Sequence, residues 1–142
     1  MRHLRHRRRQ PVTTAPTALE ARRDVALVAL DLMPRIIANA DRPRPGRLVL
    51  TRSMRLADLL RRGGGQVVWV RSERPQESSP RAAGSPRDQS PPVQLVKQTW
   101  GAFTGTGLHE LLQQRAITTL WLTGITTNQA VESTARAADG LG

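Results

Sequence analysis

Short, nearly continuous apolar runs recur along the chain and are separated by longer mixed stretches. Such runs are typical of strands that are covered on both faces, as in a parallel sheet. The pattern predicts strands at 25–30 (VALVAL), 66–70 (QVVWV) and 118–123 (TTLWLT), with a shorter candidate at 93–96. The first run ends in an aspartate, and the shorter candidate leads directly into a lysine.

Apolar residues at helical spacing lie between the predicted strands. A helix is predicted over 48–62, and it stops at three consecutive glycines that supply C-cap and turn conformations. Shorter helices are predicted over 108–115 and from about 128 to 138. Strands that alternate with helices favour the α/β class, here a doubly wound parallel sheet with helices on both faces in a three-layer, Rossmann-like arrangement.

The length of 142 residues fits one domain of ordinary size. Residues 1–23 are basic and then rich in Thr, Pro and Ala, so we expect a disordered leader followed by a folded domain over 24–142. No apolar run approaches the roughly 18 residues that cross a bilayer, and the N-terminus lacks the apolar region of a signal peptide. The sequence therefore predicts a soluble, cytoplasmic protein with no membrane contact.

The formal net charge is +11, and five arginines lie within the first ten residues. A basic tail can bind the phosphate backbone of nucleic acid by releasing counterions. The sequence shows no zinc-finger spacing, no helix with a basic face and few aromatic residues for stacking on bases. A solvated tail is therefore favoured over an arm that binds nucleic acid.

Candidate chemistry follows three of the predicted strands, at Asp31, Lys97 and the turn 124–130. Function gathers at the carboxyl ends of the strands in doubly wound sheets, so these positions are expected to meet at one edge. A carboxylate beside an ammonium can act as an acid-base pair, and a turn before a helix offers free N–H groups to an oxyanion. Lys97 stands out as the only lysine in a chain that otherwise uses arginine.

Each of these positions also has an ordinary structural interpretation. Asp31 could cap a helix, and Lys97 could be a solvated side chain. The turn could be a plain strand-to-helix connection capped by Thr127 or Asn128. The absence of cysteine excludes disulfides, cysteine-ligated zinc and a thiol nucleophile, and the three histidines are dispersed, so no metal or other cofactor is expected.

Three stretches carry a resemblance to a known family: VALVALD ending at 31, LVKQTWGAFTGTGLHELL from 95, and TTLWLTGITTNQAVESTARAA from 118. Over about 25–138 the sequence resembles the isochorismatase-like cysteine hydrolases, a superfamily that includes nicotinamidase and N-carbamoylsarcosine amidohydrolase. Its members use an Asp, Lys, Cys triad on a doubly wound sheet. The resemblance implies that Asp31 and Lys97 are the first two members of that triad.

The third member is absent, because Ala130 occupies the position of the nucleophilic cysteine. In the family the Asp accepts the thiol proton, the Lys stabilises charge, and the thiolate attacks an amide or related acyl carbon. By position, the backbone N–H groups of Thr126 and Ala130 would hold the oxyanion, next to a cis peptide bond between Ile125 and Thr126. An alanine cannot form the covalent intermediate.

The end of the chain departs from the family pattern as well. Similar proteins continue with another strand and further helix where this sequence stops at 139–142, so the resemblance implies a sheet without its last strand or strands. An unpaired edge beside 118–123 would favour self-association, and a homo-oligomer is therefore expected.

Candidate substrate-binding residues flank the predicted triad. A long Ser- and Pro-rich loop over 71–92 is expected to line the pocket entrance. Trp100 and Phe103, which follow Lys97, are candidate pocket walls, although either could equally be core packing. Thr127 and Asn128 complete the candidate set.

The residues and the family resemblance leave three possible functions. The first is an amidase-type hydrolase domain, acting on the C–N bond of small amide or carbamoyl substrates, with catalysis impaired or lost at Ala130. The second is isochorismatase-type hydrolysis of a vinyl ether, which needs no thiol and would use Asp31 as general acid. The third is a non-catalytic domain that binds a small ligand, or nucleic acid through its arginine-rich tail.

Overall fold

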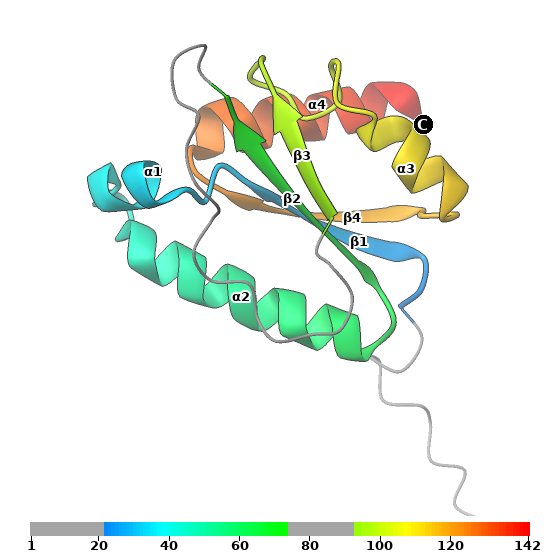
Figure 1. The fold of residues 1–142 in the computed structure, drawn as a ribbon, viewed down its shortest axis with the longest axis horizontal. Coiled ribbons are helices and arrows are strands. Elements are labelled where there is room, and N and C mark those ends of the chain that lie inside the picture. The colour runs from blue at the N-terminus through cyan, green and yellow to red at the C-terminus, as the bar shows by residue number, and fades with distance from the viewer. Residues whose placement is uncertain (1–21, 74–92) are drawn as a thin grey trace, which may run out of the picture.

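The computed structural model describes residues 22–73 and 93–142. Within them, four parallel strands form one sheet in the order β3-β2-β1-β4 (Figure 1). The strands are β1 (Val25–Leu30), β2 (Gln66–Ser72), β3 (Val93–Lys97) and β4 (Thr119–Gly124). The parallel α/β sheet predicted from the sequence is confirmed. The predicted leader lies mostly outside the described residues, since 1–21 are not among them, and so does most of the predicted loop, at 74–92.

Helices cover both faces of this sheet, as the alternation of elements predicts. The helical segments are α1 (Pro34–Asn39), α2 (Gly46–Arg62), α3 (Leu108–Gln114), the π-helical turn η1 (Thr127–Val131) and α4 (Glu132–Leu141). Figure 1 shows α1 and α2 on one side of the sheet and α3 and α4 on the other. No helix within residues 22–73 and 93–142 is long and apolar enough to cross a membrane.

The position of β1 in the sheet explains why its apolar run is unbroken, because both faces of this strand are covered. Its residues are at most 1% exposed, and successive side chains enter two different hydrophobic clusters. The cluster that includes α2 contains Val25, Leu27, Ala57, Leu60 and Val67. The cluster on the other face includes Ala26, Val28, Leu30, Leu108 and Leu112. Burial on both faces fixes β1 in the middle of the sheet.

Two elements differ from the sequence prediction in their bounds. The strand predicted over 66–70 extends to Ser72, because Arg71 and Ser72 pair with Val96 and Lys97 of β3. Polar side chains at the end of a strand hide this extension from a search for apolar runs. The helix predicted from about 128 is divided into η1 and α4, which meet between Val131 and Glu132.

One short helix was not predicted at all. The six residues of α1 contain no buried side chain, so the segment lacks the apolar stripe that marks a helix. Pro34 stands in its first turn, where the fixed φ of proline suits a helix start and no N–H is needed. Pro34 was therefore the sequence signal from which the start of α1 could have been predicted.

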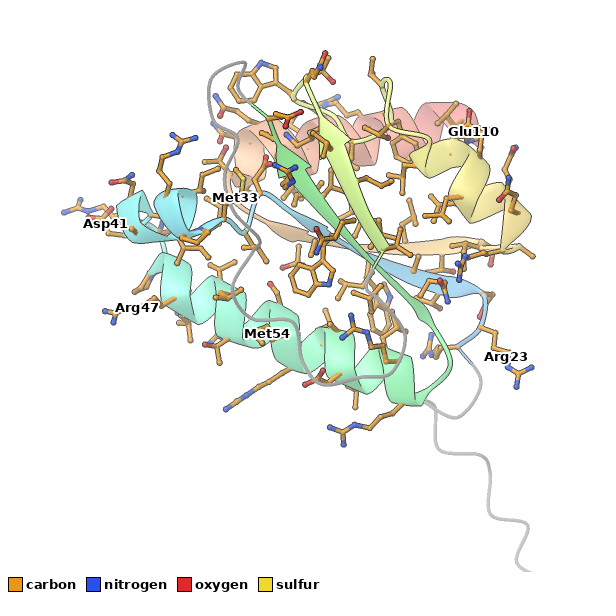
Figure 2. All side chains as sticks on the ribbon, in the orientation of Figure 1. Arg23, Met33, Asp41, Arg47, Met54 and Glu110 are labelled. Atoms are coloured by element: carbon orange, nitrogen blue, oxygen red, sulfur yellow. The ribbon has the colours of Figure 1, made fainter. Side chains whose placement is uncertain are left out.

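The expectation that no helix carries a basic face is wrong for α2. Four of its arginines are exposed, and Arg47 points away from the sheet (Figure 2). They are Arg47, Arg52, Arg55 and Arg62. The positive charge of the protein is therefore not confined to its N-terminal residues.

Candidate active site

All four strands run in one direction, so their carboxyl ends meet at one edge of the sheet. Asp31 directly follows β1, Ser72 ends β2, Lys97 ends β3 and Gly124 ends β4. The sequence placed Asp31, Lys97 and the turn after Gly124 at this edge, and the topology brings them there. Ser72 is an addition that the sequence analysis missed.

Asp31 and Lys97 form a buried ion pair at this edge. The Lys97 Nζ lies 2.8 Å from the Asp31 Oδ2, and the two residues are 1% and 5% exposed respectively. Charged groups of this kind are rarely buried unless they are paired. The interpretation of Lys97 as a solvated side chain is therefore wrong. The interpretation of Asp31 as a helix cap is also wrong, because Met33 occupies the N-cap position of α1.

The backbone of Asp31 adopts a left-handed conformation with φ of 55°. Its N–H donates to the Val70 carbonyl oxygen over 2.8 Å, so the residue still belongs to the ladder between β1 and β2. A non-glycine residue pays roughly 1–2 kcal/mol to adopt this region. Strain of this kind collects at functional sites, where the surrounding structure enforces it.

The ammonium of Lys97 has an acceptor for each of its three N–H bonds. Besides Asp31, the Nζ donates to the carbonyl oxygens of Thr99 and Trp100, each over 3.2 Å. An ammonium has three donors and no acceptor, so this side chain is fully satisfied. Lys97 is therefore held by its own strand end and the bend that follows it.

Ser72 contacts the same carboxylate from β2. Its Oγ donates to the Asp31 Oδ1 over 2.7 Å, so each carboxylate oxygen accepts a hydrogen bond from a different side chain. Ser72 is also the Cα partner of Lys97 in the ladder between β2 and β3. If the sequence had shown that β2 extends to Ser72, the rule that functional residues lie at the carboxyl ends of strands would have predicted Ser72 as a site residue.

The turn after β4 lies against the end of β1. The Ile125 N–H donates to the Leu30 carbonyl oxygen over 3.1 Å, directly before Asp31. Gly124 has a φ of 146°, and a Cβ there would lie 2.2 Å from the Leu30 oxygen, so only glycine fits. The peptide bond between Ile125 and Thr126 is cis, as the family resemblance implied.

Of the candidate oxyanion residues, Thr126 directly precedes η1 as its N-cap residue, and Ala130 is the fourth residue of η1. No side chain caps the helix start, so capping by Thr127 or Asn128 is ruled out. The first N–H groups of a helix have no acceptor within it, which leaves donors at this end. Ala130 is 2% exposed and belongs to a hydrophobic cluster. No hydrogen bond or ion pair among the described residues joins Thr126 or Ala130 to the Asp31–Lys97 pair, so their roles stay predictions.

A buried threonine connects η1 to the segment that follows Lys97. Thr134 is fully buried, and its Oγ1 donates to the Ala130 carbonyl oxygen over 2.7 Å. The same Oγ1 accepts a hydrogen bond from the Ala102 N–H over 3.1 Å. Ala130 and the segment that follows Lys97 are therefore connected through one side chain.

The candidate substrate-binding residues occupy different environments. Trp100 is 63% exposed, although its carbonyl oxygen accepts from Lys97, so its ring reaches solvent close to the ion pair. Phe103 packs against a hydrophobic cluster, which agrees with the core-packing alternative. Thr127 and Asn128 are exposed at the start of η1. Substrate contact by any of the four stays a prediction.

A metal site was not expected from the sequence. Among residues 22–73 and 93–142, no three His, Cys, Asp or Glu side chains are close enough to share an ion.

Sequence comparison identifies the family to which this fold and site belong. The Isochorismatase domain family model matches residues 25–142. An uncharacterized isochorismatase family protein of Escherichia coli O157:H7, YecD, is 35% identical over 137 residues, which cover 82% of this chain and 73% of that protein. The Bacillus subtilis protein YwoC is 34% identical over 82% of this chain and 71% of its own length. The chain belongs to the isochorismatase family.

Solved structures agree with this assignment. An isochorismatase family protein of Burkholderia thailandensis superposes with a TM-score of 0.71 at 34% identity, covering 84% of this chain and 73% of that one. The Staphylococcus aureus nicotinamidase has the same fold, with a TM-score of 0.70 at 19% identity over 84% and 78% of the two chains. The N-carbamoylsarcosine amidase of Thermoplasma acidophilum gives 0.68 at 22% identity over 81% and 75%.

Proposed function

We propose that this chain is an amidase-type hydrolase domain built for small amide or carbamoyl ligands, whose covalent chemistry is blocked because Ala130 stands in the nucleophile position. The buried Asp31–Lys97 pair at the carboxyl edge of the sheet carries the proposal. A buried ion pair contributes little net stability compared with apolar packing, so its presence at this edge argues for a chemical use.

The roles follow from the groups each residue offers. Asp31 accepts the proton of an attacking group, and Lys97 stabilises negative charge on the carboxylate and near it. The N–H groups of Thr126, which precedes η1, and of Ala130, within η1, hold the oxyanion that forms when a carbonyl is attacked. Without a thiol at 130 no acyl-enzyme forms, and the ligand binds uncut.

Two neighbours of the same fold make an amide or carbamoyl ligand the first choice. Their names describe a nicotinamidase and an N-carbamoylsarcosine amidase. Transferring that ligand class to this chain is part of the proposal. The buried carboxylate of Asp31 and ammonium of Lys97 support this ligand class.

Covalent trapping tests this function. Incubating the Ala130→Cys variant with nicotinamide and carbamoyl compounds should give an acyl adduct, visible by intact-protein mass spectrometry after acid quenching. Gln129→Cys is the matched control, because residue 129 is the exposed neighbour in the same turn and should stay unmodified. Equal labelling of both variants, or of neither, would contradict the proposal.

A second candidate is thiol-independent hydrolysis of a vinyl ether. The observation in its favour is that a small buried residue at 130 accompanies an intact Asp31. Against it, Asp31 accepts hydrogen bonds from both Lys97 and Ser72, an arrangement that suits a carboxylate taking a proton better than one supplying it. Pyruvate release from isochorismate by the unmodified chain, abolished in Asp31→Asn, would favour this candidate over the first.

A further inference from the structure

We propose that Ser72 is a positioning residue that fixes the orientation of the Asp31 carboxylate toward the reacting group. The inference rests on the proposed function, since it concerns the same ion pair. Its basis is the hydrogen bond of 2.7 Å that the Ser72 Oγ donates to the Asp31 Oδ1, on the carboxylate oxygen opposite to the one that Lys97 holds.

Two donors on two oxygens have a geometric effect that one donor lacks. Lys97 alone contacts Oδ2 and leaves the carboxylate free to rotate about its Cβ–Cγ bond. A second donor on Oδ1 fixes the carboxylate plane, in the way that paired hydrogen bonds add geometric specificity. The remaining lone pairs of the two Asp31 oxygens then have fixed directions. A base held in this way is ready to accept a proton without reorienting.

The strand register provides the means of placing this hydroxyl. Ser72 and Lys97 are Cα partners at the ends of β2 and β3, so both reach the carboxylate from the same side of β1. Within residues 22–73 and 93–142, Ser72 is the one residue whose side-chain hydroxyl donates a hydrogen bond to Asp31. The extension of β2 beyond its apolar run therefore delivers a specific side chain to the site.

The same topology argues against Ser72 as a substitute nucleophile. The order β3-β2-β1-β4 places β2 on one side of β1 and β4 with η1 on the other. The oxyanion donors at Thr126 and Ala130 are thus separated from Ser72 by the strand that carries Asp31. A hydroxyl on the far side of the carboxylate can orient it but is poorly placed to attack a carbonyl held at η1.

The single lysine of the chain offers a direct readout of this role. Full-length protein prepared with lysine carrying an NMR-active nitrogen isotope gives one side-chain ammonium signal, which reports on the Asp31–Lys97 pair without further assignment. In Ser72→Ala we expect this signal to shift and its hydrogens to exchange with water roughly tenfold faster or more, the size expected when a hydrogen bond to a charged group is lost. Ser72→Thr, which keeps the hydroxyl, should restore both.

Ser53→Ala is the matched control for nonspecific loosening. Ser53 is 1% exposed and hydrogen-bonded to the Val49 carbonyl oxygen and the Thr123 hydroxyl, but it does not touch the ion pair. It should leave the Lys97 signal unchanged even though it removes buried hydrogen bonds. An unchanged signal in Ser72→Ala, or an equal change in Ser53→Ala, would overturn the proposal.

Turnover in the Ala130→Cys background separates this inference from the proposed function. There, adding Ser72→Ala should lower kcat by about tenfold with little change in KM, and Ser72→Thr should recover most of kcat. An active Ala130→Cys variant that is indifferent to Ser72→Ala would overturn the role of Ser72 alone. A silent Ala130→Cys variant would count against the proposed function, and the lysine signal would then decide the role of Ser72 by itself.

Discussion

At the scale of single residues, the Asp31–Lys97 pair places two opposite charges in direct contact inside the protein. Replacing Lys97 with Met leaves the Asp31 carboxylate buried without its cation. We expect the free energy of unfolding to fall by about 3–5 kcal/mol, the usual cost of breaking a buried pair from one side. Urea denaturation followed by circular dichroism measures this loss.

The double variant Asp31→Asn with Lys97→Met serves as the control for that prediction. It buries no unpaired charge, so it should recover part of the lost stability. A Lys97→Met protein as stable as the parent would mean that the pair is not buried as described.

Gly124 is a second position where one residue decides the local structure. Alanine there would have to adopt a φ of 146° with its Cβ 2.2 Å from the Leu30 carbonyl oxygen. We expect Gly124→Ala to lower the free energy of unfolding by about 1–3 kcal/mol or more. In Gly140→Ala, inside α4 with nothing within 4 Å of the added methyl, stability should rise by up to about 1 kcal/mol. Thermal unfolding compares the two, and a harmless Gly124→Ala would contradict the tight turn.

Part of the site could be predicted from residues alone. Asp31 and Lys97 follow recognisable apolar runs, so the rule of strand ends was enough to pair them. Ser72 could not be found in this way, because its place at a strand end depends on pairing with β3, a contact distant in sequence. The role predicted for Ala130 came from the family resemblance, because no local pattern in the sequence indicates it.

At the scale of elements, Thr134 joins α4 to the segment after β3. Thr134→Val keeps the shape of the side chain but leaves the buried Ala102 N–H without its acceptor. We expect a loss of about 1–3 kcal/mol in the free energy of unfolding. Thr51→Val is the control, because the Thr51 hydroxyl also bonds to a carbonyl four residues earlier but is exposed, so its change should stay within about 0.5 kcal/mol. Equal effects in a denaturant titration would contradict a special role for Thr134.

Elements with an apolar signature were predictable, and elements defined by tertiary contacts were not. β1 and β4 were located to within one residue, and the C-terminus of α2 exactly as its glycines indicated. α1 escaped because it buries no side chain, and η1 because a π-helical turn has no sequence period of its own. These two less visible elements lie in the segments that follow β1 and β4.

At the scale of the whole molecule, the sheet divides the interior into two hydrophobic clusters, one toward α2 and one toward α3 and η1. The alternation of strands and helices predicted this layered class. The strand order β3-β2-β1-β4 was not predictable, because apolar periodicity says which segments are strands but not which strands are neighbours. This order sets Ser72 and Lys97 on one side of Asp31 and η1 on the other.

We propose that the site around Ala130 is intact and lacks only a thiol. The most direct test measures ammonia release from small amides and carbamoyl compounds by the unmodified chain and by Ala130→Cys under identical conditions. We expect ammonia release by the cysteine variant alone, and loss of that release when Lys97→Met is added. Robust turnover by the unmodified chain, or a cysteine variant whose activity does not depend on Lys97, would contradict this proposal.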